Sequence, residues 1–311
     1  MDDCYRIVIV RHLHIINVLL LILSGCTSTI RGSELSLEYY NLGNAYYDLA
    51  DYDKSILYYQ KAISIDSENK KAYFNLAMAL ITAGRAAEAQ GVLEELIVQD
   101  PNNQNLQEVL AFSYSAQGDN LRAIQIYRRI LEATPANNKI RYNLGMLLWK
   151  EEQREAALDA FSTILENNPE DLEALYNRGE LLLELGRIEE AVEVFEAYLQ
   201  SQPGSADAYM HLADAYRIQE RYDRALEAYA QALAYDEKRV QAWFSSAVIQ
   251  LTKIEDPDRG LTALSQALAG GFNNREAIAE LLADPQLLER DRVRALLQSS
   301  GLLPPEVEEQ G

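Results

Sequence analysis

Residues 138–171 read NKIRYNLGMLLWKEEQREAALDAFSTILENNPED, and the spacing within this stretch recurs along most of the chain. Prolines stand 34 residues apart, at Pro101, Pro135, Pro169 and Pro203. An alanine lies twelve residues before each of them, at Ala89, Ala123, Ala157 and Ala191. A large apolar residue follows each alanine by four, at Leu93, Tyr127, Phe161 and Phe195. So many phased positions predict an array of short structural repeats.

The period divides the chain into seven repeats, and apolar residues recur at helical spacing within each of them. The predicted repeats are 36–69, 70–103, 104–137, 138–171, 172–205, 206–239 and 240–273. Gly84 and Gly118 are placed to end first helices, and the prolines are placed to end second helices. The seventh repeat holds one extra residue in its turn, near Pro257. Residues 274–311 are predicted to form two capping helices, Arg275–Leu282 and Gln286–Ser299, and a frayed tail.

These positions resemble the signature of the tetratricopeptide-repeat family, W-x2-L-G-x2-Y, then A-x3-F, then P. Leu42–Gly43 and Leu144–Gly145 match its first part, and the phased alanines and prolines match the rest. The resemblance covers residues 36 to about 270. It implies an all-α fold, a right-handed α-solenoid of about seven helix-turn-helix repeats closed by C-terminal capping helices.

The first 25 residues have the organisation of a secretion signal. Arg6 and Arg11 precede an apolar run from Ile15 to Leu23, which is nine residues long. As a helix this run extends roughly 14 Å, whereas the hydrocarbon core of a bilayer is about 30 Å thick. The run is therefore too short for a permanent membrane span and is typical of a cleaved signal peptide.

The signal ends in Leu23–Ser24–Gly25–Cys26, which resembles the bacterial lipobox L-[AS]-[GA]-C. The resemblance implies that Cys26 is acylated and becomes the mature N-terminus, with residues 26–35 as the acylated cysteine and its tether. The residue after the cysteine is Thr27 and not an aspartate. In many two-membrane bacteria this favours attachment to the outer membrane. We therefore expect a lipid-anchored protein of the bacterial cell envelope that faces the periplasm. The alternative is a buried apolar helix with an incidental cysteine.

Charge and cysteine content exclude several classes of function. The net charge is -20, so the chain lacks the basic surface that binds nucleic acid phosphates. The same charge repels anionic lipid headgroups, so electrostatics alone will not hold the protein at a membrane. Cys4 lies in the predicted signal, which leaves no disulfide and no cysteine zinc site in the mature chain.

Signs of catalysis are weak. His211 is the one histidine beyond the predicted signal, and it could act as an acid or base or simply pack between repeats. Adjacent carboxylates such as Glu94 and Glu95 lie about 100° apart on a helix and do not converge on one site. Nucleophile, phosphate-loop, zinc and calcium motifs are absent from the sequence. We expect no catalytic residue, no cofactor and no metal site.

A partner-binding groove is implied by the family resemblance, because first helices of such repeats line a concave ligand surface. The candidate groove residues are Tyr40, Asn44, Phe74, Asn75, Met78, Phe112, Tyr142, Asn143, Met146, Trp149, Tyr176 and Asn177. Aromatic side chains offer a partner large apolar area, and asparagine can both donate to and accept from a peptide backbone. Two alternatives stay open: the asparagines could pack repeats together, and the aromatic rings could stack on one another.

The groove residues also indicate what kind of partner to expect. Tyr40 stands where the family's carboxylate clamp carries lysine, so a clamp for acidic C-termini is not expected. The later repeats instead add acidic side chains, at Glu173, Glu180, Asp207 and Asp214. We expect an apolar segment to bind the early repeats and a basic segment to bind the later ones.

The leading hypothesis is a membrane-anchored, non-catalytic scaffold that binds protein or peptide partners and no nucleic acid. A second hypothesis is an accessory lipoprotein that binds a small hydrophobic solute for a transporter. An enzyme of unknown kind is the third.

Overall fold

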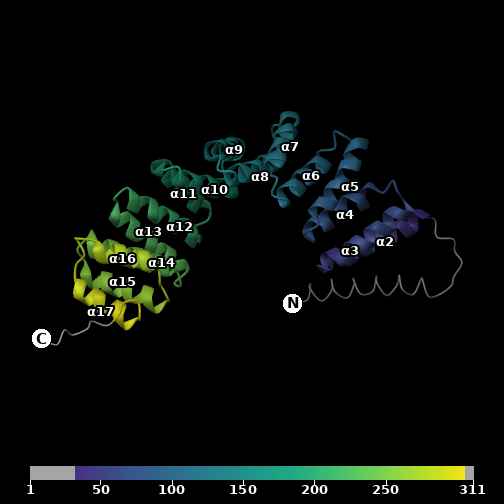
Figure 1. The fold of residues 1–311 in the computed structure, drawn as a ribbon. Coiled ribbons are helices and arrows are strands. Elements are labelled where there is room, and N and C mark those ends of the chain that lie inside the picture. The colour runs from purple at the N-terminus through teal and green to yellow at the C-terminus, as the bar shows by residue number, and fades with distance from the viewer. Residues whose placement is uncertain (1–31, 305–311) are drawn as a thin grey trace. The chain divides into compact units, whose positions relative to one another are not determined.

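The computed structural model describes residues 32–304, and all regular structure within them is helical. The chain divides into two compact units, Met1–Gln153 (unit 1) and Arg154–Gly311 (unit 2). Unit 1 contains α2 (Gly32–Asp48), α3 (Tyr52–Ile65), α4 (Lys70–Thr82), α5 (Ala86–Gln99), α6 (Gln104–Ala116), α7 (Asn120–Ala133) and α8 (Asn138–Lys150) (Figure 1). Unit 2 contains α9 (Arg154–Asn167), α10 (Leu172–Glu184), α11 (Ile188–Ser201), α12 (Ala206–Ile218), α13 (Tyr222–Tyr235), α14 (Val240–Thr252), α15 (Pro257–Ala269), α16 (Arg275–Ala283) and α17 (Arg290–Ser299). The expected all-α fold is confirmed.

Each predicted repeat corresponds to one pair of helices, from α2–α3 to α14–α15. The two helices of the fourth repeat, α8 and α9, belong to different units. The helices that lie on the same side of successive pairs contact each other within a unit, as α2, α4 and α6 do. Below, a position is counted from the first residue of each 34-residue repeat.

Helix ends follow from residues that the period places there. The last residue of one repeat caps the first helix of the next, because its side-chain oxygen accepts a backbone N–H of the first turn. These capping residues are Asn69, Asn103, Asn137, Asp171 and Ser205. Gly84 and Gly118 end first helices as predicted, with φ of +78° and +83°, a conformation that glycine adopts without strain.

The two helices of a repeat approach closely where position 8 is small. Gly43 lies against the ring of Tyr59, and a Cβ at Gly43 would be 2.5 Å from that ring. Gly179 lies in the same way against Phe195, at 2.7 Å. The large residue at position 24 is thereby fully enclosed, since Tyr59 is only 1% exposed and Phe195 is 0% exposed. Burial of such a side chain stabilises the fold by about 1.5–3 kcal/mol.

The C-terminal helices cover the apolar side of the last repeat. Phe272 stacks on Phe244 with ring centroids 4.0 Å apart, and Val293 and Leu297 of α17 are fully buried in the same core. The four residues between α14 and α15 include the extra turn residue that the sequence predicted. The second capping helix begins at Arg290, not at Gln286 as predicted, because Glu289 adopts a left-handed conformation that starts the helix after it.

The predicted tether is partly wrong. Helix α2 begins at Gly32, so residues 32–35 are its first turn and not an extended linker. The start of α2 packs against the end of α3: a Cβ at Gly32 would lie 3.7 Å from the Ile65 side chain, and the buried Ser36 hydroxyl donates to the Ala62 carbonyl at 3.0 Å. The predicted signal peptide, Cys26 and residues 305–311 of the predicted tail lie outside the described residues. Within residues 32–304, none of the helices has the length and apolar content to cross a bilayer.

Candidate functional site

The candidate groove residues lie on first helices, and we describe them unit by unit. The first-helix face of unit 1 is formed by α2, α4, α6 and α8, and that of unit 2 by α10, α12 and α14. Ten of the twelve candidates belong to unit 1, whereas Tyr176 and Asn177 belong to unit 2. Most of these side chains are half-buried, so they both pack and face solvent.

A hydrogen-bond network centred on Asn44 joins the first two repeats. Its Oδ1 accepts from the Tyr59 hydroxyl at 2.7 Å and from the Asn75 side-chain amide at 2.8 Å. The same amide of Asn75 donates to the Tyr40 hydroxyl at 3.2 Å. Position 6 of the second repeat is thus tied to positions 5, 9 and 24 of the first.

The same four positions interact at later junctions. Asn143 hydrogen-bonds the buried Tyr127 hydroxyl, as Asn75 lies beside Tyr59. Between the fifth and sixth repeats His211 takes position 6, where it meets Tyr176 at 3.0 Å and Glu180 at 3.3 Å. We call the contact of the position-6 side chain, Asn75, Asn143 or His211, with the preceding repeat the position-6 bridge.

The bridge supports the packing alternative for the asparagines. Asn75 and Asn143 use their amides to hold neighbouring repeats together, so they are not simply displayed for a peptide. Burial raises the pKa of Tyr59 and of Tyr127 to about 12, so both hydroxyls stay protonated at neutral pH. Asn177 differs, since its amide donates to the Glu173 carbonyl one turn earlier in α10, at 2.8 Å.

A surface pocket of about 290 Å³ opens beside this network in unit 1. Its walls are Asn44, Tyr47, Asp48, Tyr59, Asn75 and Met78. Tyr47 and Asp48 were not among the candidates, although Tyr47 stands at position 12, one of the positions that face ligands in this family. The pocket therefore combines apolar rings, two amides and one carboxylate.

Apolar side chains continue along the same face of unit 1. Phe112 on α6 is 47% exposed and Met146 on α8 is 38% exposed. Phe74 and Met78 pack instead against the core between the first repeats, and Tyr142 and Trp149 are half-buried. Exposed apolar groups on a helix face are what a protein partner can bury.

Aromatic stacking is the second alternative, and it applies to Tyr176 in unit 2. Its ring lies edge-on to Phe195 at 6.0 Å and to Tyr198 at 5.4 Å. Burial, followed by the nearby Glu180 carboxylate, raises the pKa of Tyr176 to about 12. This candidate therefore packs within its own repeat and against His211 of the next one.

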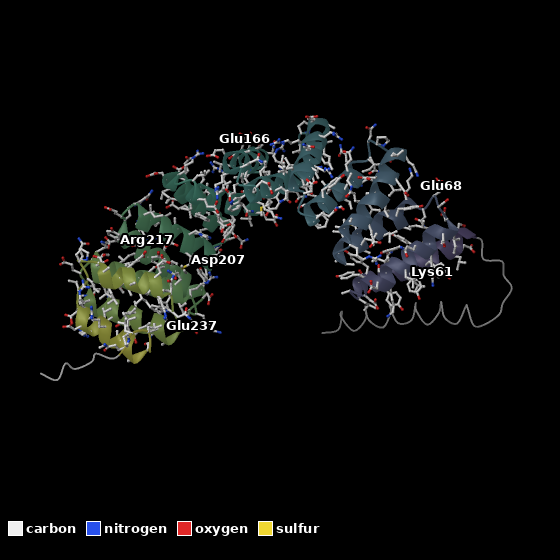
Figure 2. All side chains as sticks on the ribbon, viewed as in Figure 1. Lys61, Glu68, Glu166, Asp207, Arg217 and Glu237 are labelled. Atoms are coloured by element: carbon white, nitrogen blue, oxygen red, sulfur yellow. The ribbon has the colours of Figure 1, made fainter. Side chains whose placement is uncertain are left out.

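The acidic residues of unit 2 are partly paired. Arg239 forms an ion pair with Asp207 and holds the pKa of that carboxyl below its usual range. Asp214 accepts a hydrogen bond from the Tyr229 hydroxyl and lies 3.6 Å from Arg217. Figure 2 labels Asp207 and Arg217, which both belong to α12. Neighbouring arginines thus offset part of the negative charge of the predicted acidic surface.

His211 has a packing environment. Its ring stacks on the buried Phe195 with centroids 5.1 Å apart and an interplanar angle of 15°. Its Nε2 faces the Tyr176 hydroxyl and Glu180, as the position-6 bridge requires. Among residues 32–304, histidine, cysteine and carboxylate side chains do not gather in groups of three that could hold a metal ion.

Family profiles described as tetratricopeptide repeat match residues 36–69, 58–91, 108–153, 142–206 and 182–243. Together these matches cover residues 36–91 and 108–243, which is more than half of the 311 residues. The chain belongs to the tetratricopeptide-repeat family. Proteins of this family are in general non-catalytic scaffolds for protein interactions, and the repeats support that general role here.

Solved structures with the same fold come from several bacteria. A tetratricopeptide repeat protein from Parabacteroides merdae has a TM-score of 0.55 at 18% identity, over 84% of this chain and 99% of that one. The C-terminal part of a repeat protein from Cytophaga hutchinsonii has a TM-score of 0.68 at 15% identity, over 77% and 98%. YrrB, described as a TPR protein with an unusual peptide-binding site, has a TM-score of 0.51 at 26% identity, over 60% and 96%. No curated protein sequence matches the chain.

Proposed function

We propose that this protein is a non-catalytic scaffold of the bacterial cell envelope, acylated at Cys26, that binds a segment of a partner protein on its first-helix faces. The observation that carries the binding role is the first-helix face of unit 1. There the exposed Phe112 and Met146 share a face with the pocket that Asn44, Tyr47 and Asp48 line. The peptide-binding site described for YrrB, a protein of the same fold, supports a peptide ligand.

The chemistry of the face defines the partner. Phe112 and Met146 favour large apolar side chains, which gain free energy by leaving water. The carboxylate of Asp48 in the pocket favours a neighbouring basic side chain. In unit 2, Asp207 and Asp214 already contact arginines and Glu180 contacts His211, so Glu173 is the acidic group that would meet a further basic residue. The proposed ligand is a basic, amphipathic segment.

A calorimetric titration with a basic amphipathic peptide tests the binding role. The double variant Phe112→Ala, Met146→Ala removes exposed groups, so it should weaken binding about tenfold or more while the fold is retained. Val98→Ala is the matched control, because Val98 is 82% exposed on a second helix of the same unit. Equal affinity of the double variant and the control would refute the assigned face. A small molecule that co-purifies in native mass spectrometry would favour the solute-binding alternative.

Membrane attachment at Cys26 is the second part of the proposal. Gly32, where α2 begins, is the sixth residue after Cys26, and six extended residues reach at most about 20 Å. An acylated Cys26 would therefore keep the first repeat close to the membrane. We infer that the anchor lies in the outer membrane and that the repeats face the periplasm, because Thr27 and not an aspartate follows Cys26. Labelling with a fatty-acid analogue in cells, followed by membrane fractionation, tests this. Cys26→Ser should lose both the label and the membrane fraction, and retention of either contradicts acylation.

A further inference from the structure

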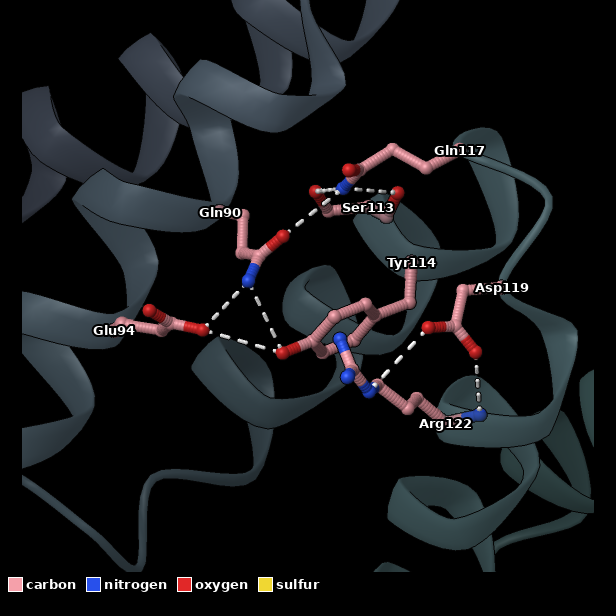
Figure 3. A network of polar contacts seen from close by, with 7 residues as sticks. All are labelled: Gln90, Glu94, Ser113, Tyr114, Gln117, Asp119 and Arg122. Atoms are coloured by element: carbon pink, nitrogen blue, oxygen red, sulfur yellow. Dashed lines mark hydrogen bonds and ion pairs between the residues drawn. The ribbon is translucent and has the colours of Figure 1, made fainter.

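Three of the seven repeats, the first, third and sixth, have a tyrosine at position 11. In the third repeat the Tyr114 hydroxyl donates to Glu94 at 3.2 Å and accepts from Gln90 at 3.2 Å (Figure 3). The guanidinium of Arg122 lies 5.4 Å from the centre of the Tyr114 ring, in reach of a cation–π interaction. Arg122 is in turn paired with Asp119, the residue that caps its helix, at 3.3 Å. We call the space that this ring occupies the tyrosine slot.

The tyrosine slot recurs in other repeats. In the sixth repeat the Tyr216 hydroxyl donates to Glu196, and the Arg221 guanidinium lies 4.6 Å from the ring centre. In the first repeat Lys54 lies 5.1 Å from the ring of Tyr46 and pairs with the capping residue Asp51. Each slot therefore holds a phenol ring beneath a cation. In the third and sixth repeats a carboxylate of the preceding repeat also accepts a hydrogen bond from the hydroxyl.

The seventh repeat keeps the cation of the slot but lacks the ring. Asp256 caps α15 and pairs with Arg259 at 3.6 Å, as Asp119 pairs with Arg122. Gln250 stands where the first, third and sixth repeats have tyrosine and the second, fourth and fifth have leucine. Glu94 and Glu196 each directly follow the buried residue at position 24, and Ala230 takes that place in the sixth repeat. Relative to the Tyr114–Glu94 and Tyr216–Glu196 junctions, both the tyrosine and its carboxylate partner are thus replaced by smaller groups.

These replacements leave a pocket of about 350 Å³ between α13, α14 and α15. It is lined by Leu226, Ala230, Leu233, Trp243, Ser246, Gln250, Arg259, Thr262 and Ala263. The Oε1 atom of Gln250 is buried, and it has no hydrogen-bond partner within residues 32–304. A buried acceptor without a donor costs free energy that a ligand donor would recover. The volume is within the usual range for ligand sites, about 300–1,000 Å³.

We propose that this pocket binds a para-hydroxyphenyl group, the side chain of a tyrosine presented by a partner protein. The ring replaces the missing ring of the slot, against Leu226, Leu233 and Trp243. Its hydroxyl donates to Gln250 Oε1, and the Arg259 guanidinium covers its face. Arg259 disfavours a cationic side chain, and Phe would leave the Gln250 acceptor without a donor. The site is separate from the first-helix faces. The test of this proposal is therefore independent of the proposed function.

Trp243 makes the pocket observable. The chain has two tryptophans, so Trp149→Phe leaves Trp243 as the single indole signal. Its Nε1 donates to the Glu237 carbonyl at 3.2 Å, while the ring lines the pocket. The probe is N-acetyltyrosinamide, titrated while the indole N–H resonance of Trp243 is followed by NMR. We expect a saturable shift, and about tenfold weaker binding of N-acetylphenylalaninamide, which lacks one hydrogen bond.

Two variants separate this proposal from nonspecific binding. Gln250→Tyr with Ala230→Glu rebuilds the Tyr216–Glu196 pair inside the pocket, so it should abolish the probe-induced shift and raise Tm. Gln250→Leu keeps the pocket apolar but removes the acceptor, so tyrosine and phenylalanine probes should bind equally. Phe112→Ala with Met146→Ala is the control and should leave the shift unchanged. The proposal is wrong if wild type shows no saturable shift, if it binds both probes equally, or if the shift persists in the folded Gln250→Tyr, Ala230→Glu variant.

Discussion

The side-chain amide of Asn75 on α4 donates to Asn44 Oδ1 on α2, and this contact joins the first helices of the first two repeats. The same Asn44 oxygen accepts from the buried Tyr59 hydroxyl, so one acceptor satisfies two donors from different helices. A residue type that sequence reasoning assigned to ligand binding therefore first serves the contact between repeats. Each asparagine must be tested for stability before a loss of binding is attributed to a ligand contact.

We predict that Asn75→Ala lowers the free energy of unfolding by about 1–3 kcal/mol, because it removes one of the two hydrogen bonds to Asn44 Oδ1 and the hydrogen bond to the Tyr40 hydroxyl. Urea unfolding followed by circular dichroism measures the change. Asn41→Ala is the matched control, since Asn41 is exposed at the same position of the first repeat, which has no preceding repeat among the described residues. A similar loss in both variants would contradict the position-6 bridge.

A second prediction concerns the close approach of helices at position 8. Gly43→Ala places a Cβ 2.5 Å from the Tyr59 ring, which is enclosed and cannot move away, so overpacking should destabilise the protein by about 1–3 kcal/mol. Gly91→Ala is the control, because nothing lies within 4 Å of a Cβ there and alanine is the better helix former. Thermal unfolding should show a lower Tm for Gly43→Ala and an equal or higher Tm for Gly91→Ala.

The repeat boundaries could be predicted because they depend on local residues. Pro101 stops a second helix and Gly84 ends a first one through their own backbone chemistry, without help from distant residues. The 34-residue period was therefore enough to place these helix ends. The start of α2 was missed because the Ser36 hydrogen bond to the Ala62 carbonyl joins residues that are far apart in sequence.

The site was predicted less completely than the fold, for the same reason. Sequence placed Asn75 and Tyr176 on the correct helices, but it could not show that the amide of Asn75 is engaged by Asn44 or that Tyr176 packs against Tyr198. The vacant tyrosine slot at Gln250 has a sequence signal: Gln250 and Ala230 stand at the paired positions that hold Tyr and Glu at two other junctions. That signal can be interpreted only once the structure shows that the Tyr114 hydroxyl donates a hydrogen bond to Glu94.

A third prediction assigns His211 to packing. His211→Asn keeps a polar side chain of the kind that bridges other repeats, whereas His211→Ala loses both the polar contacts and the stack on Phe195. We expect Ala to destabilise by about 1–3 kcal/mol and Asn by less, with peptide binding unchanged in the folded Asn variant. A folded, equally stable Ala variant would show that the ring does not hold the repeats together.

A fourth prediction is a loss of stability at alkaline pH that depends on the buried tyrosines. Burial raises the folded-state pKa of Tyr59 and Tyr127 to about 12, whereas a tyrosine of the unfolded chain has a pKa of about 10. Below pH 10 both states are protonated and the contribution of these groups to stability is fully present. Between about pH 10 and 12 the unfolded state loses its protons first, so the free energy of unfolding falls.

Tyr59→Phe and Tyr127→Phe remove those ionisations, so each variant should show a shallower fall in stability over this pH range. Tyr59→Phe should also be about 1 kcal/mol less stable at neutral pH, because the hydroxyl that donates to Asn44 is lost. Urea unfolding at a series of pH values, with phenolate absorbance as the second readout, measures both effects. Tyr235→Phe is the control at an exposed tyrosine and should leave the slope unchanged. An identical slope in wild type and Tyr59→Phe would mean that Tyr59 has the same pKa in the folded and unfolded states. Burial would then not shift that pKa.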